Sequence, residues 1–381
     1  MGSIFSLISQ GLAKAVGSSG KGTKDDASLL VNGKVFDGWT EIQIKRSLKA
    51  ISGAFELKLI DKWAEQKVAW QIVPNDECVL KVGDETLITG YVDSVNPTFS
   101  NTTRSVSVSG RDKSADLVDC SAEHKPGNWT NISLERLCNI VCKPFGVKVT
   151  NSVTGLKPFL SWRINEGEAG FETLDRAAKM SGVLLVSDGD GGIVITRAST
   201  DRAATRLEQG VNILSGSANY ETKERFSKYT VKGQMGGYDN EVPAVDFATK
   251  AVVTDSFIKR FRPITIISEG AATLAICQLR AKWEMSFRSA KSARFNIVVQ
   301  GWKQENGSLW TTNKVVNLNS NFLGINQDFL ITSVTFSKTS GGTLTNLELE
   351  RPDAYTPDPT IRMRAAGEAI AQLVQEDKAR R

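Results

Sequence analysis

The feature that most constrains the fold of this chain is a strand-like segment that occurs twice. GDETLITGYVDSV covers residues 83–95, and NQDFLITSVTF, residues 326–336, repeats its Leu-Ile-Thr core about 240 residues later. In both copies apolar and polar residues alternate, as is typical of a half-buried β-strand. An acidic residue, Asp84 or Asp328, comes shortly before each copy. One tripeptide match is common by chance, but the flanks and the hairpin context are also similar, so we expect a duplicated β-rich module.

The 381 residues are enough for two to four domains, and their patterns divide the chain into five parts. The predicted parts are an N-terminal arm and linker (1–27), a first β-barrel domain (28–120), an α+β module (121–210), a second β-barrel domain with one long helix (211–355) and a C-terminal helical tail (356–381). Short alternating runs dominate the two barrel regions, whereas helical periodicity appears between them. The predicted fold is therefore mainly β with an α+β insertion: two related antiparallel, tube-like β-barrel domains plus a small α+β module.

Capping signals define the predicted α+β module more closely. Ser133 is placed to cap a helix whose apolar positions run to Cys142, and Gly182 is placed as the left-handed terminator of a second helix. Two apolar runs then flank the sequence SDGDGG, residues 187–192, as in a β-hairpin. This sequence also resembles the start of a calcium loop, but position twelve is Ser199 where a glutamate is required. We therefore interpret it as a hairpin turn.

The inventory of catalytic side chains is poor. The chain has one histidine, His124, in a polar loop. Histidine-based triads, multi-histidine zinc sites and facial metal triads would all need it and further residues, so we interpret it as a surface loop histidine. Its five cysteines are an odd number, and Cys138 and Cys142 lie one helical turn apart in an apolar pattern, so they are interpreted as reduced core thiols. We predict no cofactor and no metal, and a protein made and kept in the cytosol.

Charge and hydropathy name no partner by themselves. The net charge of +5 comes from 47 basic and 42 acidic residues interspersed along the chain, without the concentrated basic stripe of a nucleic-acid groove. A stable DNA-binding function would therefore need strong salt-dependent retention of DNA to support it. The first residues lack the basic region of a secretory signal and are too short and interrupted to span a bilayer, so no stable membrane association is expected.

The most enzyme-like cluster is RDKSAD, residues 111–116, because it collects both charge signs and a hydroxyl. Its two carboxylates, Asp112 and Asp116, could in principle serve a glycosidase. Local pairing at helical spacing is the favoured interpretation, with the cluster acting as a folding or docking surface. When the two copies are aligned on Leu-Ile-Thr, Arg351 and Asp353 of the second copy correspond to Arg111 and Asp112 of the first. The candidate interface residues are Arg111, Asp112, Lys113, Asp116, Arg351 and Asp353.

Several longer strings resemble one family. They are LITGYVD (87–93), VSVSGRDKSADLVDCSA (106–122), CKPFGV (142–147), GVLLVSDGDGG (182–192), RFSKYTVKGQ (225–234) and WTTN (310–313). In order along about residues 28–355, they are similar to the baseplate hub of Mu-like contractile-tailed bacteriophages, within the phage late control protein D group. A collinear series of this kind is far more specific than any single motif.

The resemblance implies a structural, non-enzymatic protein of the virion tail baseplate. It implies a homotrimeric ring of tube-like β-barrel domains, in which two related units per chain give six similar units that can meet a hexameric ring. The implied partners are the tail tube protein, a trimeric spike protein and neighbouring baseplate proteins, with DNA only in transient passage through a central channel. The alternative function is a tail-associated peptidoglycan-degrading glycosidase that uses Asp112 and Asp116.

Overall fold

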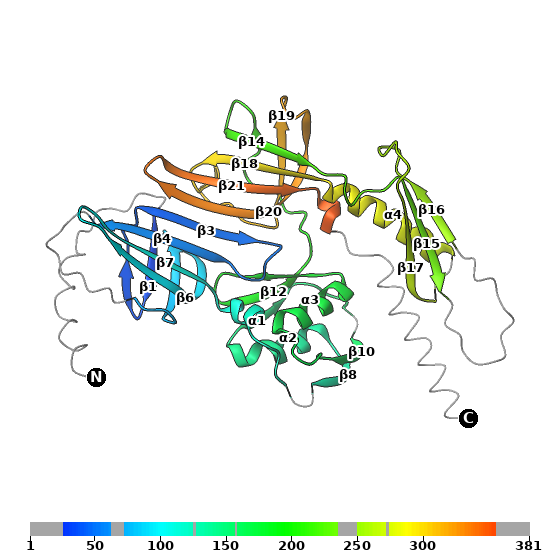
Figure 1. Cartoon of the computed structure of the whole chain (residues 1–381), viewed down its shortest axis with the longest axis horizontal. Helices are drawn as coiled ribbons and strands as arrows, with labels where there is room; N and C mark the ends of the chain where they lie inside the picture. Colours follow the sequence, from blue (N-terminus) through cyan, green and yellow to red (C-terminus); the bar gives the residue numbers. More distant parts are fainter. Residues whose placement is uncertain are drawn as a thin grey trace.

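The computed structural model shows a mainly antiparallel β protein with an α+β module below its centre (Figure 1). It describes residues 26–61, 72–124, 127–156, 158–234, 250–271 and 274–355. The predicted C-terminal tail and almost all of the predicted N-terminal arm lie outside the described residues. Of the helices in the described part of the chain, none is long and apolar enough to cross a membrane.

A single 13-stranded sheet contains strands of both predicted β-rich regions. The first unit comprises β1 (Ala27–Val31), β2 (Lys34–Phe36), β3 (Glu41–Ser47), β4 (Ala54–Asp61), β5 (Glu77–Val82), β6 (Glu85–Phe99) and β7 (Arg104–Asp112). The second unit comprises β13 (Leu207–Glu208), β14 (Ile213–Tyr220), β18 (Ala293–Gln300), β19 (Val315–Ser320), β20 (Ile325–Thr339) and β21 (Gly342–Glu350). The predicted fold class, mainly β with related β-rich units, is confirmed.

The strand order shows that the two units are built alike. The order β3-β4-β7-β6 in the first unit repeats the order β14-β18-β21-β20 in the second, and β5 joins β6 as β19 joins β20. The two units are joined in one sheet, because β20 pairs with β3 from Ser333 opposite Ser47 to Lys338 opposite Ile42. Within the described residues no ladder closes either unit into a barrel. The result is one long curved sheet made of two consecutive copies.

The duplicated hairpins differ in register from the sequence alignment. β6 and β20 each have 15 residues, and β7 and β21 each have nine. Each hairpin has a register shift, between Val92 and Ser94 in the first copy and between Ile331 and Ser333 in the second. Aligning these bulges places the two Leu-Ile-Thr tripeptides four positions apart. The duplication is therefore in the hairpin and its bulge, which redirects the strand, and the tripeptide match is not in register.

The α+β module has its own core and follows the capping signals. It contains α1 (Asp116–Asp119), β8 (Asn128–Ile132), α2 (Leu134–Cys142), β9 (Lys148–Asn151), β10 (Phe159–Arg163), α3 (Gly170–Ser181), β11 (Leu184–Ser187) and β12 (Gly192–Thr196). The Ser133 hydroxyl accepts a hydrogen bond from the Arg136 amide, and Gly182 ends α3 at a φ of 64°. Cys138 and Cys142 are buried in this core, as predicted, and burial raises the pKa of Cys142 to about 12.

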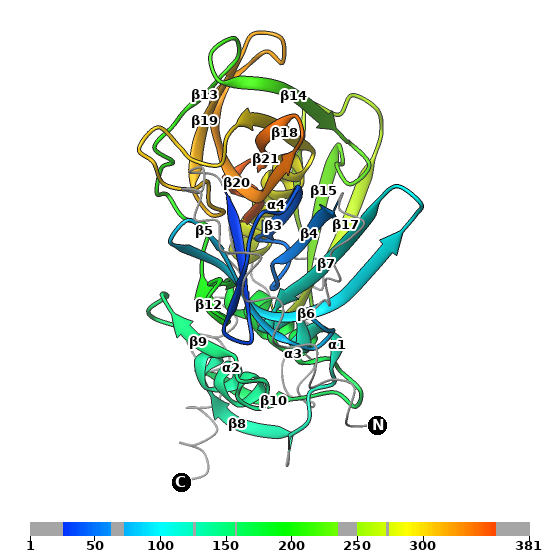
Figure 2. The same ribbon diagram turned by 90° about the vertical axis from the view of Figure 1, so that its left-hand side faces the viewer.

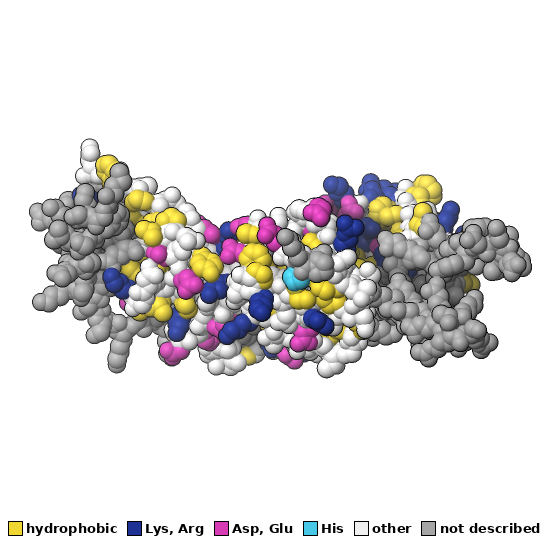
Figure 3. Space-filling model, turned by 90° about the horizontal axis from the view of Figure 1, so that it is seen from below, with side chains coloured by type: hydrophobic (Ala, Val, Ile, Leu, Met, Phe, Trp, Pro, Cys, Tyr) yellow, Lys and Arg dark blue, Asp and Glu magenta, His cyan; other side chains and the backbone are white. Residues whose placement is uncertain are grey.

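A third β-element departs from the sequence prediction. β15 (Lys228–Gln234), β16 (Lys250–Thr254) and β17 (Pro263–Ala271) form a separate three-stranded sheet with α4 (Leu274–Lys291) on one face. The sequence prediction places these strands in the second β-barrel domain, because alternation indicates a half-buried strand but not which sheet it joins. The long helix itself is confirmed. Basic side chains gather at this end of the elongated molecule (Figure 3).

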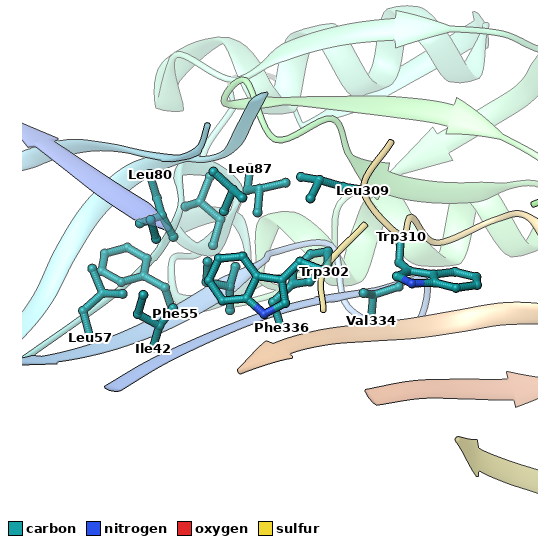
Figure 4. Packing of buried hydrophobic residues seen from close by; sticks show 14 of the residues in the cluster. Ile42, Phe55, Leu57, Leu80, Leu87, Trp302, Leu309, Trp310, Val334 and Phe336 are labelled. Carbon is teal, nitrogen blue, oxygen red and sulfur yellow. The ribbon is translucent and has the colours of Figure 1, made fainter. Parts of the chain in front are cut away.

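The two units of the large sheet share one hydrophobic core. Trp302, Phe336 and Trp310 from the second unit belong to the same cluster as Ile42 and Leu80 from the first, and Figure 4 shows Trp302 and Phe336 in the middle of this packing. The Trp302 ring is fully buried, and its Nε1 donates a hydrogen bond of 3.0 Å to the Ser337 carbonyl. Seen along the molecule, the β6–β7 hairpin projects away from the rest of the first unit (Figure 2).

The shared core predicts that the two units lose stability together. Trp302→Ala should lower the free energy of unfolding by about 3–5 kcal/mol, because it removes a fully buried indole. Urea unfolding followed by circular dichroism measures this change. The control Phe322→Ala removes a side chain that is 84% exposed and should change stability by less than about 0.5 kcal/mol. A loss in Trp302→Ala no larger than in the control would contradict the shared core.

Candidate functional site at the junction of the first unit and the module

The carboxylate of Asp112 joins three segments at the end of β7. Its Oδ2 accepts hydrogen bonds from the Gly53 amide at 2.6 Å and from the Ser187 hydroxyl at 2.8 Å. Gly53 lies between β3 and β4, whereas Ser187 ends β11 of the module. Arg46 of β3 donates a further bond of 2.7 Å to the Ser187 carbonyl. The side chain of Asp112 is almost fully buried, so it anchors the module on the first unit.

The turn SDGDGG completes this junction. Gly189 has a φ of +89°, and a Cβ on it would lie 2.8 Å from the Leu87 carbonyl oxygen of β6, so glycine is required. Asp188 Oδ1 accepts from the amides of Asp190 and Gly192, both at 2.8 Å. The hairpin-turn interpretation is confirmed, because the Asp188 carboxylate closes its own turn. The turn docks the module against β6.

The two carboxylates of the glycosidase hypothesis occupy different environments. Burial raises the pKa of Asp112 above its ordinary value, and a smaller burial raises the pKa of the half-buried Asp116. General acid catalysis needs a carboxyl within hydrogen-bond reach of the substrate. Asp112 is enclosed by Gly53 and Ser187 and has no surface to offer a polysaccharide. It is for the same reason not an exposed interface residue.

The exposed part of the cluster is organised by Arg111. Its guanidinium bonds Asp93 at 2.7 Å and Asp119 at 2.6 Å, where sequence spacing suggested Asp112 and Asp116. The hydrogen bond from Arg111 lowers the pKa of Asp119. Sequence reasoning missed Asp93, because its approach depends on the pairing of β6 with β7. The nearby Lys113 reaches Glu77 at 3.6 Å.

A second buried carboxylate ends the equivalent hairpin of the second unit. Glu350 is 2% exposed, and its Oε1 contacts Lys49 Nζ at 2.7 Å and Arg294 Nε at 3.2 Å. Arg351 and Asp353, the expected counterparts of Arg111 and Asp112, form a surface pair with each other at 2.8 Å. Neither Arg351 nor Asp353 is buried between segments as Asp112 is. Lys49 instead ties Glu350 to the segment after β3, so this carboxylate joins the two units.

Comparison with known proteins identifies the family. Profiles described as the N-terminal domain of the Mu phage baseplate assembly protein GpP-like family, the second domain of baseplate hub protein gp44-like, and the fourth domain of GpP match residues 26–112, 114–197 and 273–358. The chain is 32% identical to baseplate hub protein gp44 of Escherichia phage Mu over 316 residues, which are 81% of this chain and 83% of that protein. The chain belongs to the family of Mu-like phage baseplate hub proteins.

Solved structures agree with this assignment. A 43 kDa tail protein of prophage MuSo2 from Shewanella oneidensis is 37% identical to the hub with a TM-score of 0.78, covering 88% of this chain and 100% of that one. A tail protein from Neisseria meningitidis MC58 has a TM-score of 0.72 at 23% identity, covering 87% and 98%, and supports the fold alone. The predicted family resemblance is thus confirmed, and the hub is a baseplate component of a Mu-like phage tail.

The Asp112 junction predicts a destabilisation that depends on pH. Asp112→Ala should lower the free energy of unfolding of the hub by about 1–3 kcal/mol, because it leaves buried donors unsatisfied. The raised pKa of Asp112 means that the folded state holds a proton that the unfolded state releases. The ordinary pKa of an aspartate is about 4. The stabilisation by Asp112 is therefore fully present below about pH 4 and decreases as pH rises through the raised pKa of the folded state.

Urea unfolding between about pH 4 and pH 7 tests this sign. The difference between wild type and Asp112→Ala should be larger at the acidic end. Asp119→Ala is the matched control, because the pKa of Asp119 is lowered from its ordinary value of about 4. Its contribution should stay constant across this range and be lost only at more acidic pH, as pH falls through the lowered value. If the Asp112→Ala difference stays constant or grows with rising pH, this role of the junction is wrong.

Proposed function

We propose that three copies of this hub form a ring of six similar β-units that joins a hexameric tail tube to a trimeric spike around a central channel. The observation that carries the proposal is the repeated strand order in one sheet. Each chain already joins its second unit to its first through β20 and β3. The same join between chains, repeated three times, closes a ring because a head-to-tail interface with a suitable rotation is cyclic.

The free sheet edges support this assembly. β14 pairs only with β18 among the described strands, and residues 93–99 of β6 pair only with β7. Natural proteins protect exposed edges with charges, especially lysine. β14 has the sequence ILSGSANY and the free part of β6, residues 93–99, has the sequence DSVNPTF, in which Asp93 is the one charge. Two almost uncharged edges at opposite ends of a repeated sheet favour pairing with each other in neighbouring copies.

The internal β20–β3 ladder predicts the register of that contact. Alignment of the bulges makes Thr335 of β20 equivalent to Asn96 of β6. Lys45 of β3 is equivalent to Asn219 of β14. The paired residues lead from Lys45 through β4 and β7 to Tyr91 of β6, and from Asn219 through β18 and β21 to Leu330 of β20. Tyr91 and Leu330 each lie two positions before the bulged residue. Thr335 lies opposite Lys45 within the chain. Asn96 of one copy is therefore placed opposite Asn219 of the next.

The remaining parts of the proposal follow from a structural role. The candidate interface residues that reach the surface at least in part are Arg111, Lys113, Asp116, Arg351 and Asp353. We assign them to contacts with neighbouring chains or baseplate proteins. DNA passes through the channel without stable binding there, and the protein is made in the cytoplasm of the bacterial host. We propose no enzymatic activity, and no contact in the described residues favours the glycosidase alternative.

A disulfide between edges tests the ring. In a Cys120→Ser background, which removes the exposed native thiol, Asn96→Cys with Asn219→Cys should give chains linked covalently to one another under mild oxidation. Directly opposite residues on antiparallel strands lie about 4.5–5.5 Å apart at Cα, within disulfide range. Native mass spectrometry should show three copies, and a non-reducing gel should show linked species.

The matched control pairs Asn101→Cys with Asn219→Cys, because residue 101 lies beyond the end of β6 and should not be linked. Measurements are made with the hub alone and with its tube and spike proteins, since assembly depends on concentration and partners. A stable dimer, or equal linking of both cysteine pairs, would contradict the proposed ring.

A further inference from the structure

The free edge of β6 ends in an aromatic side chain that is almost fully exposed. Phe99, the last residue of β6, is 87% exposed. Its side chain lies on the core face of the sheet, the face that carries the shared hydrophobic core, because Val95 on the same face lies opposite the buried Val108. The β6–β7 hairpin projects away from the rest of its unit (Figure 2). The ring of Phe99 therefore extends the core face beyond the core of its own copy.

The free edge of β14 has the converse feature, a glycine inside a strand. Gly216 lies opposite Ile297 of β18, whose side chain is fully buried. A Cβ on Gly216 would lie 3.1 Å from Ile297 Cδ1 and 3.9 Å from Leu323 Cδ1, so this position also belongs to the core face. Glycine inside a strand weakens it and often marks a place where another segment approaches closely. An apolar ring over Gly216 would contact Ile297 and Leu323.

The register of the proposed ring brings Phe99 and Gly216 together. With Asn96 opposite Asn219 on antiparallel strands, Phe99 of one copy lies opposite Gly216 of the next. Residues of the core face then meet residues of the core face, since Val95, Pro97 and Phe99 lie opposite Tyr220, Ala218 and Gly216. A slip of one residue would place each of these apolar side chains against a polar one. This match supports the register independently, because the register came from the bulges alone.

Side chains have a larger share in this junction than in the ladder inside the chain. Pro97 has no N–H to donate to a neighbouring strand. At the point equivalent to Phe99 and Gly216, the internal ladder has Lys338 opposite Ile42, and Lys338 binds Asp26 at 2.8 Å. The junction between chains has an aromatic ring and a glycine there instead. An aromatic residue opposite an edge glycine is a known way to fix strand register.

The pair also distinguishes unlike edges from like edges. Residues 93–99 of β6 contain no glycine. The one aromatic ring of β14, Tyr220, already packs edge-on against Phe295 of its own copy at 5.8 Å. Two β6 edges, or two β14 edges, therefore lack one member of the pair. Pairing of like edges gives a twofold dimer, whereas pairing of unlike edges gives the head-to-tail contact that a ring needs.

We propose that Phe99 of one copy packs over Gly216 of the next copy, and that this contact selects the head-to-tail junction over pairing of like edges. The inference rests on the ring under Proposed function, but it concerns which side chains make the junction selective. The occupant of the exposed Phe99 ring is thus a second copy of this chain. Each junction of the ring contains one such contact.

The rate of disulfide linking in the full-length hub tests the contact. The reference is the Asn96→Cys and Asn219→Cys pair in the Cys120→Ser background, because its linking rate reports how often the edges meet. Phe99→Ala should lower this rate about 10- to 150-fold, as expected for loss of a buried phenylalanine side chain. Gly216→Val should lower it as well, since its side chain occupies the place of the ring. Circular dichroism checks that each variant keeps its fold.

The double variant Phe99→Ala with Gly216→Val separates a direct contact from general damage. It should link faster than either single variant, because valine fills part of the space that the ring leaves, and such coupling is expected only of residues in contact. Phe261→Ala is the matched control, because it removes a phenylalanine that is 86% exposed in the β16–β17 connection. It should link at the reference rate.

The outcomes distinguish this contact from the ring itself. If the reference pair links but Phe99→Ala links as fast as Phe261→Ala, the ring stands and the Phe99 contact is wrong. Additive losses in the double variant would also overturn the contact. If the reference pair does not link at all, the ring and the contact are both wrong. Unchanged linking together with lost binding of the tube or spike protein in Phe99→Ala would assign Phe99 to that partner instead.

Discussion

The ladder between β3 and β20 is the constraint on which the rest of the structure depends. It joins residues 41–47 to residues 325–339, so nearly the whole described chain lies between the two strands it pairs. Six residue pairs and a shared core around Trp302 fix the orientation of the two units relative to each other. Contacts of such high sequence separation form only after a large loss of chain entropy. Once formed, they place the α+β module and the small β15–β17 sheet as insertions into a fixed frame.

The bulge of each hairpin has a different partner, and this difference defines the two kinds of sheet edge. In β20 the bulged residue Thr332 directs its carbonyl to β3, where it accepts bonds from the Leu48 amide at 2.8 Å and the Ser47 hydroxyl at 3.3 Å. In β6 the bulged residue is Asp93, which binds Arg111 at the surface. The bulge of β20 therefore joins the two units inside the chain, whereas the equivalent bulge of β6 remains at the surface.

The sequence predicts what is local and fails on what is decided at a distance. The Ser133 cap, the left-handed Gly182 and the SDGDGG turn are correct, because each depends on a few neighbouring residues. The β3–β20 pairing and the separate β15–β17 sheet were not predicted, since alternation does not identify a partner strand. The charged string RDKSAD resembles a solvated surface throughout, and nothing within it reveals that the carboxylate of Asp112 is buried against Gly53 and Ser187.

Insertions explain why two similar units can serve partners of different symmetry. In the first unit a short segment, residues 48–53, connects β3 to β4. At the equivalent place in the second unit, between β14 and β18, the chain inserts β15–β17 and α4. Such connections tolerate insertion because the flanking strands carry the pairing. In the proposed ring the sheet then repeats six times, whereas the inserted β15–β17 sheet occurs on alternate units. The strand frame can meet a hexamer, and the insertions impose the threefold pattern of a trimer.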